Sequence, residues 1–107
     1  MIRIDFFVLP DGGMKGFQIE GHAGYADAGM DIICSAVSSA AFMALNTVTD
    51  VLRVMPLTLR AEEGSMLLRV EDRDISACRD ILEGLKLHLL NLEEQYTDYI
   101  CVKYMEV

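Results

Sequence analysis

Basic residues are scarce in this chain of 107 residues. Nine Lys and Arg residues stand against 17 Asp and Glu residues, which gives a net charge of −8. The few cations are scattered, and the sequence has neither an Arg-rich segment nor a basic strip interleaved with aromatic residues. A phosphate backbone would be repelled, so we expect no direct nucleic-acid binding and favour a basic protein or peptide as the partner.

Long apolar runs are also lacking. We find no stretch that approaches the roughly 20 residues of a membrane span, and Arg3 and Asp5 interrupt any N-terminal signal core. We therefore expect a cytoplasmic protein with no membrane partner. Hydrophobic residues make up 52% of the chain and charged residues 24%, which is typical of a folded protein rather than a disordered one. The length fits a single domain over 1–107 with one core.

Cysteines are few, odd in number and widely spaced. Cys34, Cys78 and Cys101 form neither a disulfide framework nor a CxxC zinc motif. We expect reduced thiols, with Cys78 and Cys101 acting as small buried hydrophobic residues. No GKS or GKT sequence follows the glycine-rich segment 21–30, and Asp31 would repel phosphate at the start of the next element. A phosphate-binding loop is therefore excluded.

Alternating apolar residues and turn sequences predict five strands, and apolar residues at three- and four-residue steps predict two helices. In chain order these are strands over 2–9 and 14–20, a helix over 31–55, strands over 57–61 and 65–70, a helix that starts at Asp72 or Asp74, and a strand over 99–105. The order ββαββαβ contains two hairpins. It predicts an α+β fold in which two helices pack on a mainly antiparallel sheet.

The first predicted helix is long, and its first half is rich in small side chains. Asp31 suits the N-cap, because its carboxylate accepts from the free amides of the first turn, and Pro56 would end the helix after Met55. A helix of this length on so small a domain leaves apolar surface uncovered in a monomer, so we expect a homodimer. In the second helix, an apolar stripe over positions 75, 78, 82, 85, 89 and 92 is expected to face the core.

His22 and Cys34 have the clearest catalytic potential. They flank segment 21–30, which is rich in glycine and has no regular period, so we predict a loop that lets the chain fold back. If Asp31 is the N-cap, Cys34 is the third helical residue, where free amides and the helix dipole favour a thiolate. His22 could accept the thiol proton, as a cysteine nucleophile at neutral pH requires. A loop histidine bonded to the backbone accounts for His22 equally well.

Other residues near this pair have weaker claims. Ser38 lies one helical turn beyond Cys34 and could line the site, although a small spacer is an alternative. Asp31 could orient His22 as the acid of a triad, but its capping role explains it equally well. One thiolate and one imidazole fall short of the usual zinc ligands, so we expect no metal and no cofactor. His88, within the second predicted helix, receives no role.

Two segments of the sequence resemble the ribosomal-processing cysteine proteases called Prp. They are Gly21-His22-Ala23-Gly24-Tyr25-Ala26 and, after Gly29, Asp31-Ile32-Ile33-Cys34-Ser35-Ala36-Val37-Ser38. The resemblance implies a cytosolic, dimeric endopeptidase that removes an N-terminal extension from the twenty-seventh large-subunit ribosomal protein and so supports ribosome assembly. It places His22 and Cys34 at the dyad positions, with Ser35 where alanine is more usual. It also implies a loop that orders around the substrate and includes Gly21, Gly24, Tyr25 and Gly29.

Two other functions are compatible with the residues alone. In a non-enzymatic ribosome-assembly module, the small-residue helix would serve docking and Cys34 would be a buried residue at the helix start. A thiol redox sensor would need a resolving cysteine near Cys34, and the spacing places neither Cys78 nor Cys101 there. For the peptidase, the acidic surface would attract a basic ribosomal substrate.

Overall fold

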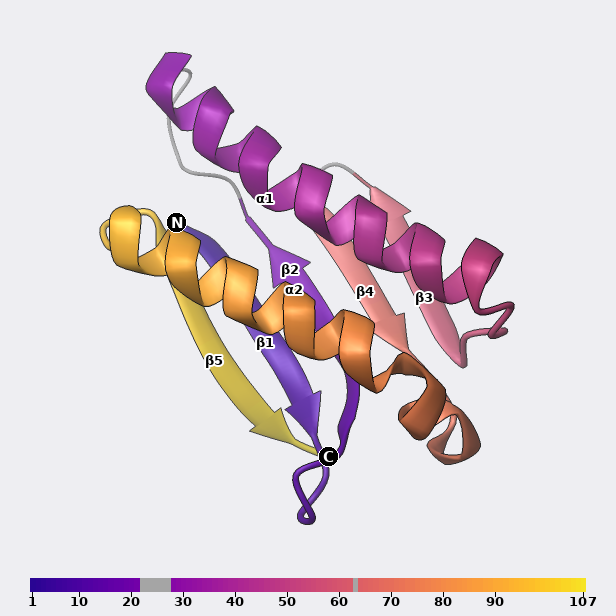
Figure 1. Cartoon of the computed structure of the whole chain (residues 1–107). Coiled ribbons are helices and arrows are strands. Elements are labelled where there is room, and N and C mark those ends of the chain that lie inside the picture. Colours follow the sequence, from indigo (N-terminus) through magenta and orange to yellow (C-terminus); the bar gives the residue numbers. More distant parts are fainter. Residues whose placement is uncertain (22–27, 63) are drawn as a thin grey trace.

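The strands and helices of the computed structural model follow the predicted chain order (Figure 1). The structure describes residues 1–21, 28–62 and 64–107, and for 28–31 the backbone alone. The elements are β1 (Ile2–Val8), β2 (Met14–Glu20), α1 (Ala28–Asn46), a π-helical turn (Thr47–Val51), β3 (Thr58–Glu62), β4 (Ser65–Arg69), a 3-10 turn (Asp72–Asp74), α2 (Ile75–Gln95) and β5 (Ile100–Glu106). The order ββαββαβ is confirmed, and the strand ends lie within one residue of the predicted positions.

The strands form one sheet in the order β3-β4-β2-β1-β5. Within the described ranges, every strand pairing is antiparallel except that between β1 and β5, where the last strand runs parallel to the first. The mainly antiparallel sheet predicted from the two hairpins is confirmed. A register shift between Phe7 and Val8 marks an irregularity of the β-bulge type, which bends and twists the strand locally.

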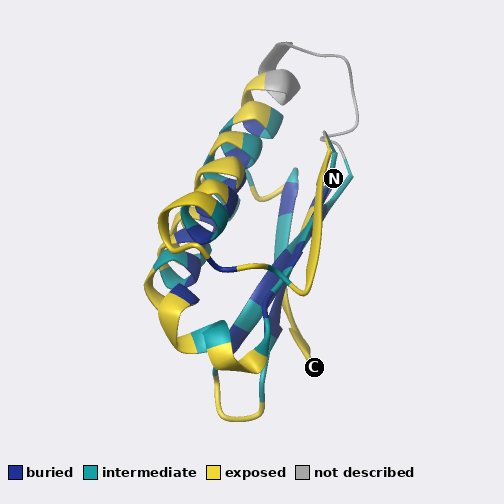
Figure 2. Ribbon diagram, turned by 90° about the vertical axis from the view of Figure 1, so that its right-hand side faces the viewer, coloured by how far each residue is buried: buried dark blue, intermediate teal, exposed yellow. Residues whose placement is uncertain are grey.

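Both helices lie on the same face of the sheet, as the view in Figure 2 shows. Successive strand residues point to opposite faces, so Ile2, Ile4 and Phe6 are buried beneath the helices while Arg3 and Asp5 point to the other face. Further core residues include Phe17, Ile19, Val37, Ala41, Ala44, Met66 and Leu68. The α+β architecture is therefore a sheet covered on one side.

The apolar stripe predicted for the second helix faces this core. Its buried members in α2 are Cys78, Leu82, Leu85 and Leu89. Ile75 and Leu92, toward the two ends of the helix, are partly buried and pack against the same cluster. Asp74 occupies the N-cap position, but its side chain makes no capping hydrogen bond in the described structure.

The first helix begins earlier than the sequence predicts. It already includes Ala28, Gly29 and Asp31, so the prediction that Asp31 is the N-cap is wrong. Alanine is the best helix former, and the cost of one glycine is only about 1 kcal/mol, which the packing of a helix of 19 residues on the sheet outweighs. Counted from Ala28, Cys34 is the seventh residue of α1 rather than the third.

The first helix also ends earlier than predicted. Its regular part stops at Asn46 and the π-helical turn reaches Val51, so the predicted end at Met55 is wrong. The Thr47 hydroxyl donates to the carbonyl four residues before it at 2.8 Å, an arrangement that often bends helices. Arg53 then has a φ of 58°, in the left-handed region that a right-handed helix does not use. The helix therefore ends before Pro56, the residue that was predicted to end it.

Among the described residues, one helical segment, Ile32–Val51, is long and apolar enough to cross a membrane by length and composition alone. We expected no apolar segment of this length, but these 20 residues have a mean hydropathy of 1.6. One helix of this kind is weak evidence for a membrane span, because the core helix of a soluble protein passes the same test. Here Val37, Ala41 and Ala44 of this segment belong to the core beneath α1.

Candidate active site

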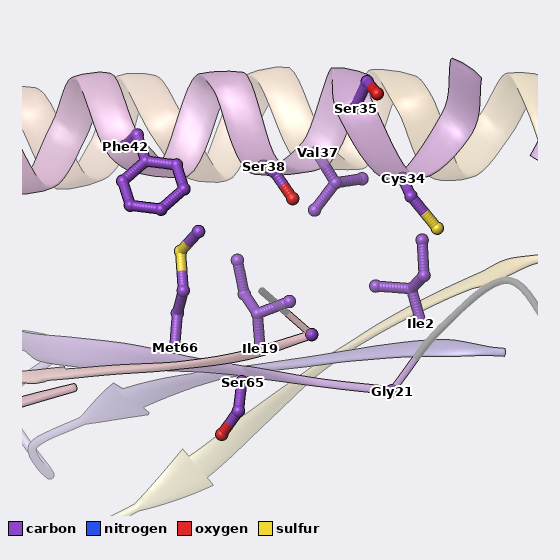
Figure 3. Close-up of a pocket in the computed structure, with 11 residues that line it drawn as sticks. Ile2, Ile19, Gly21, Cys34, Ser35, Val37, Ser38, Phe42, Ser65 and Met66 are labelled. Carbon is purple, nitrogen blue, oxygen red and sulfur yellow. The ribbon is translucent and has the colours of Figure 1, made fainter. Parts of the chain in front are cut away.

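A cavity of about 490 Å³ lies between α1 and the adjoining ends of β2 and β4 (Figure 3). Ligand sites in proteins span about 300 to 1,000 Å³, so this cavity is large enough for a peptide side chain. From the helix it is lined by Cys34, Ser35, Val37, Ser38 and Phe42. From the sheet side it is lined by Ile2, Ile19, Gly21, Gly64, Ser65 and Met66.

Cys34 stands at one end of this cavity. Its side chain is half-buried, and the sulfur projects from α1 toward the sheet, on the side where Ile2 lies (Figure 3). The residue packs against the core cluster, so the fold fixes its position. Reactive cysteines are partly exposed, whereas fully buried ones are inert. The arrangement is suitable for attack on a molecule bound in the cavity.

The helix N-terminus contributes less to this thiol than the sequence predicts. The free amides of a helix belong to its first four residues, here 28–31, and Cys34 lies beyond them. The dipole field also falls off within the first turn. The prediction that Cys34 is the third helical residue is therefore wrong.

The two serines near Cys34 differ in orientation. Ser38, one turn further along α1, is half-buried and directs its hydroxyl toward the cavity (Figure 3). Ser35 is exposed and projects away from the sheet. Phe42 and Met66 form the apolar end of the cavity opposite Cys34. One end of the cavity thus offers a thiol and a hydroxyl, and the other offers apolar surface.

Two glycines form the sheet-side wall near Cys34. Gly21 follows β2, and its amide donates to the carbonyl of Gly64 at 3.0 Å, just before β4. Both residues have positive φ, 97° at Gly21 and 79° at Gly64. A Cβ on Gly21 would lie 2.6 Å from the carbonyl oxygen of Met1, so glycine is required there. The chain therefore leaves β2 in a direction that this turn fixes, one residue before His22.

Most of the predicted substrate loop lies outside the described residues, including His22, Gly24 and Tyr25. Gly29 is part of α1, so its assignment to a loop is wrong. Asp31 lies in α1 three residues before Cys34, and its side chain is outside the description. In the described part of the chain, no three His, Cys, Asp or Glu side chains gather as they would around a metal ion.

The other two cysteines and the second histidine lie outside the lining of the cavity. Cys78 is buried in α2, where burial first and the charge of Asp74 second raise the pKa of its thiol. Cys101 is the register partner of Arg3 on the parallel β1–β5 pair, so its side chain is on the uncovered face of the sheet. His88 is exposed on α2. The prediction that Cys78 is a small buried residue is confirmed, whereas Cys101 is only half-buried.

Apart from Gly21, the sequence did not predict the sheet side of the cavity. Gly64, Ser65 and Met66 reach it because β4 pairs with β2, which brings them beside Gly21 and Ile19. The turn signal at 62–64 indicates a hairpin, but a hairpin does not say which distant strand it joins. To predict this side of the cavity, one would have to know that the β1–β2 hairpin pairs with the β3–β4 hairpin through β2 and β4.

The family described as cysteine protease Prp matches residues 1–101 of the chain. The ribosomal processing cysteine protease Prp of Staphylococcus aureus is 26% identical over 105 residues, which cover 97% of this chain and 99% of that protein. The protein of the same name from Bacillus subtilis is 27% identical over 97 residues, which cover 86% and 87% of the two chains. A crystal structure of the S. aureus protease with a covalently linked product peptide has a TM-score of 0.85 at 25% identity, with 98% of this chain and 100% of that chain covered.

Proposed function

Because the chain belongs to the cysteine protease Prp family, we propose that it is an endopeptidase in which Cys34 is the nucleophile and His22 the general base. The observation that carries the proposal is the Cys34 thiol at the end of a cavity large enough for a peptide side chain. The covalent product complex of the S. aureus relative supports a covalent mechanism on this fold. The thiol, the cavity and the family together favour acyl transfer through sulfur.

His22 is proposed as the base because of its place in the chain. It is bonded to Gly21, which lines the same cavity as Cys34, and consecutive Cα atoms are only about 3.8 Å apart. A thiol with an ordinary pKa of about 8.5 is only a few per cent ionised at neutral pH. Since the free amides of α1 precede Cys34, an imidazole is the group best suited to activate it.

The reaction proceeds in two halves. The His22 imidazole takes the proton of Cys34, and the sulfur attacks the scissile carbonyl carbon to form a tetrahedral intermediate. His22 returns the proton to the leaving amine, the C–N bond breaks, and a thioester to Cys34 remains. Water then gives a proton to His22 and attacks the thioester, which releases the acid product and restores the thiol.

We propose supporting roles for Asp31 and Ser38. Asp31 lies in α1 three residues before Cys34, and we propose that it orients His22 as the acid of a triad. Ser38 directs its hydroxyl toward the cavity that Cys34 lines and would hydrogen-bond a bound peptide. Gly21, Gly24 and Tyr25 would contact that peptide from the segment after β2.

As the substrate we propose the twenty-seventh large-subunit ribosomal protein, carrying a short N-terminal extension, in the cytoplasm. The resemblance implies this protein, and the relatives are named ribosomal processing proteases. A net charge of −8 favours encounter with a basic ribosomal protein. Removal of the extension would support ribosome assembly.

Incubation of the purified protein with the extended ribosomal protein tests this function. We expect mass spectrometry to show that the wild type shortens the substrate by its extension and that the His22→Ala variant does not. A ribosomal protein made without the extension is the control, and its mass should stay constant. If the wild type binds the extended protein but leaves it intact, the chain is a binding module and the peptidase assignment is wrong.

We also propose that the protein is a homodimer. In α1, Ile32 and Met43 are 67% and 54% exposed, and a second copy would cover them. Sedimentation equilibrium at micromolar concentration should give the mass of a dimer. Met43→Glu should shift it toward the monomer, whereas Leu87→Glu, at a similarly exposed residue of α2, should not. A strictly monomeric wild type would refute the proposal.

A further inference from the structure

A hydrogen-bonded cluster lies at the adjoining ends of β2, β3 and β4. Oε1 of Glu20 accepts from Arg60 Nη2 at 3.0 Å, from Ser65 Oγ at 3.0 Å and, more weakly, from Gln18 Nε2 at 3.4 Å. Nε of Arg60 also donates to Ser65 Oγ at 2.9 Å. We call Glu20, Arg60 and Ser65 the rim cluster. Through it, one carboxylate joins three neighbouring strands.

The rim cluster adjoins the sheet side of the cavity. Glu20 precedes Gly21 and Ser65 follows Gly64. The amide nitrogen of Gly21 donates a hydrogen bond to the carbonyl oxygen of Gly64 at 3.0 Å, and both glycines line the cavity. Glu20 and Ser65 are also register partners at the end of the β2–β4 ladder. The Ser65 side chain points away from the cavity (Figure 3), so the cluster acts from the opposite face of the sheet and leaves the cavity itself open.

The glycine wall needs support of this kind. Gly21 and Gly64 have no side chains that could pack against the core, and they lie beyond the last register pair of β2 and β4. All five residues of β3 are exposed, so core packing holds this side of the hairpin weakly. Ends of elements with few buried contacts open most easily. The rim cluster supplies the side-chain link that fastens the hairpin to β2.

The charges in the rim cluster favour the ionised carboxylate. Burial raises the pKa of Glu20, but hydrogen bonds from Ser65, Gln18 and Arg60, with the charge of Arg60, outweigh burial and hold the pKa below its usual value. Arg3, the register partner of Glu20 on β1, is a further cation on the same face. Hydrogen bonds to a carboxylate are stronger than neutral ones, so these contacts should persist at neutral pH.

We propose that Glu20 is a positioning residue for peptide binding, which through Ser65 and Arg60 holds the Gly21–Gly64 wall where a bound peptide meets it across from Cys34. This inference rests on the proposed peptidase function. Glu20 does not touch the reacting atoms. Loss of its carboxylate should therefore weaken peptide binding and leave the chemistry of the Cys34 thiol unchanged.

The test compares the Glu20→Ala variant with the wild type on a synthetic peptide that spans the cleaved junction of the ribosomal protein. We expect KM to rise roughly three- to tenfold while kcat stays within about twofold. The rate at which iodoacetamide modifies Cys34 should also stay within about twofold. Glu20→Gln keeps an acceptor oxygen and should recover part of the loss. Should Glu20→Ala fail to fold, Ser65→Ala removes only one hydroxyl from the rim cluster and should raise KM in its place.

Asp72→Asn is the matched control, because it removes a carboxylate that pairs with Lys15 at the other end of β2. Its KM should equal that of the wild type. An unchanged KM in Glu20→Ala, an equal rise in Asp72→Asn, or a parallel fall of kcat and of the alkylation rate would overturn the proposal. If the wild type cleaves no peptide, the proposed function fails by itself. In that case, binding of the labelled peptide is compared between the Cys34→Ala variant and the double variant that also carries Glu20→Ala. Equal affinities of the two would refute the positioning role separately.

Discussion

The Cys34→Ala variant should cleave the ribosomal substrate at least about 10³-fold more slowly than the wild type, with an unchanged fold. The substitution removes the atom that would form the thioester. It should cost little stability, because Cys34 is half-buried on the wall of an open cavity and its loss creates no enclosed void. Measurement of kcat/KM together with circular dichroism separates loss of chemistry from loss of structure. Cys101→Ala is the matched control and should keep its activity.

Alkylation examines the same thiol without a substrate. At neutral pH, iodoacetamide should modify Cys34 much faster than Cys78, whose thiol is buried with a raised pKa, and faster than Cys101 on β5. In His22→Ala the reaction at Cys34 should slow at neutral pH and recover at alkaline pH, where the thiol ionises without a base. Equally slow modification of the three cysteines would contradict the assignment of Cys34 as the nucleophile.

Local periodicity predicted most of the fold. Alternation predicted the strands, and the apolar stripe predicted for the second helix identified the buried side of α2. Such a pattern is reliable where an element buries a single face against the core, as α2 does. The order of elements then restricts the topology to hairpins with few crossovers, which is what the sheet shows.

The ends of α1 could not be predicted in the same way. Asp31 is a favourable N-cap in isolation, yet the helix continues through Ala28 because packing on the sheet outweighs the penalty of Gly29. At the other end, the Thr47 hydroxyl and the positive φ of Arg53 end the helix before Met55. Both outcomes depend on contacts and backbone angles that spacing does not encode.

In the candidate site too, one part could be predicted from the sequence and another could not. Cys34 and Ser38 share a helix face because they are four residues apart, so the helix side of the cavity follows from the sequence. The sheet side, including Gly64 and Met66, depends on the pairing of β2 with β4. Periodicity reports which face of a strand is buried and says nothing about its neighbour. The pairing of His22 with Cys34 stays a prediction.

The Gly16→Ala variant should lose more than about 3 kcal/mol of the free energy of unfolding. Gly16 lies in β2, which β1 and β4 flank, with a φ of 154°. A Cβ there would stand 1.9 Å from the carbonyl oxygen of Leu68 and 2.8 Å from its carbonyl carbon. These are backbone atoms, so no side-chain rotation relieves the clash. The added methyl would force β2 and β4 apart in the middle of the sheet.

Gly84→Ala makes the same chemical change in α2 and should have the opposite sign. Apart from its chain neighbours and the nearby backbone of its own helix, no described atom lies within 4 Å of a Cβ built on Gly84, which is an exposed position inside a helix. Alanine there should stabilise the protein by about 0.5 to 1 kcal/mol. Urea unfolding of both variants measures the two changes on one scale. Because each variant gains one methyl, the difference in sign reports backbone crowding and not hydrophobicity. A Gly16→Ala midpoint equal to that of the wild type would contradict the close approach of β2 to β4 on which the sheet side of the cavity depends.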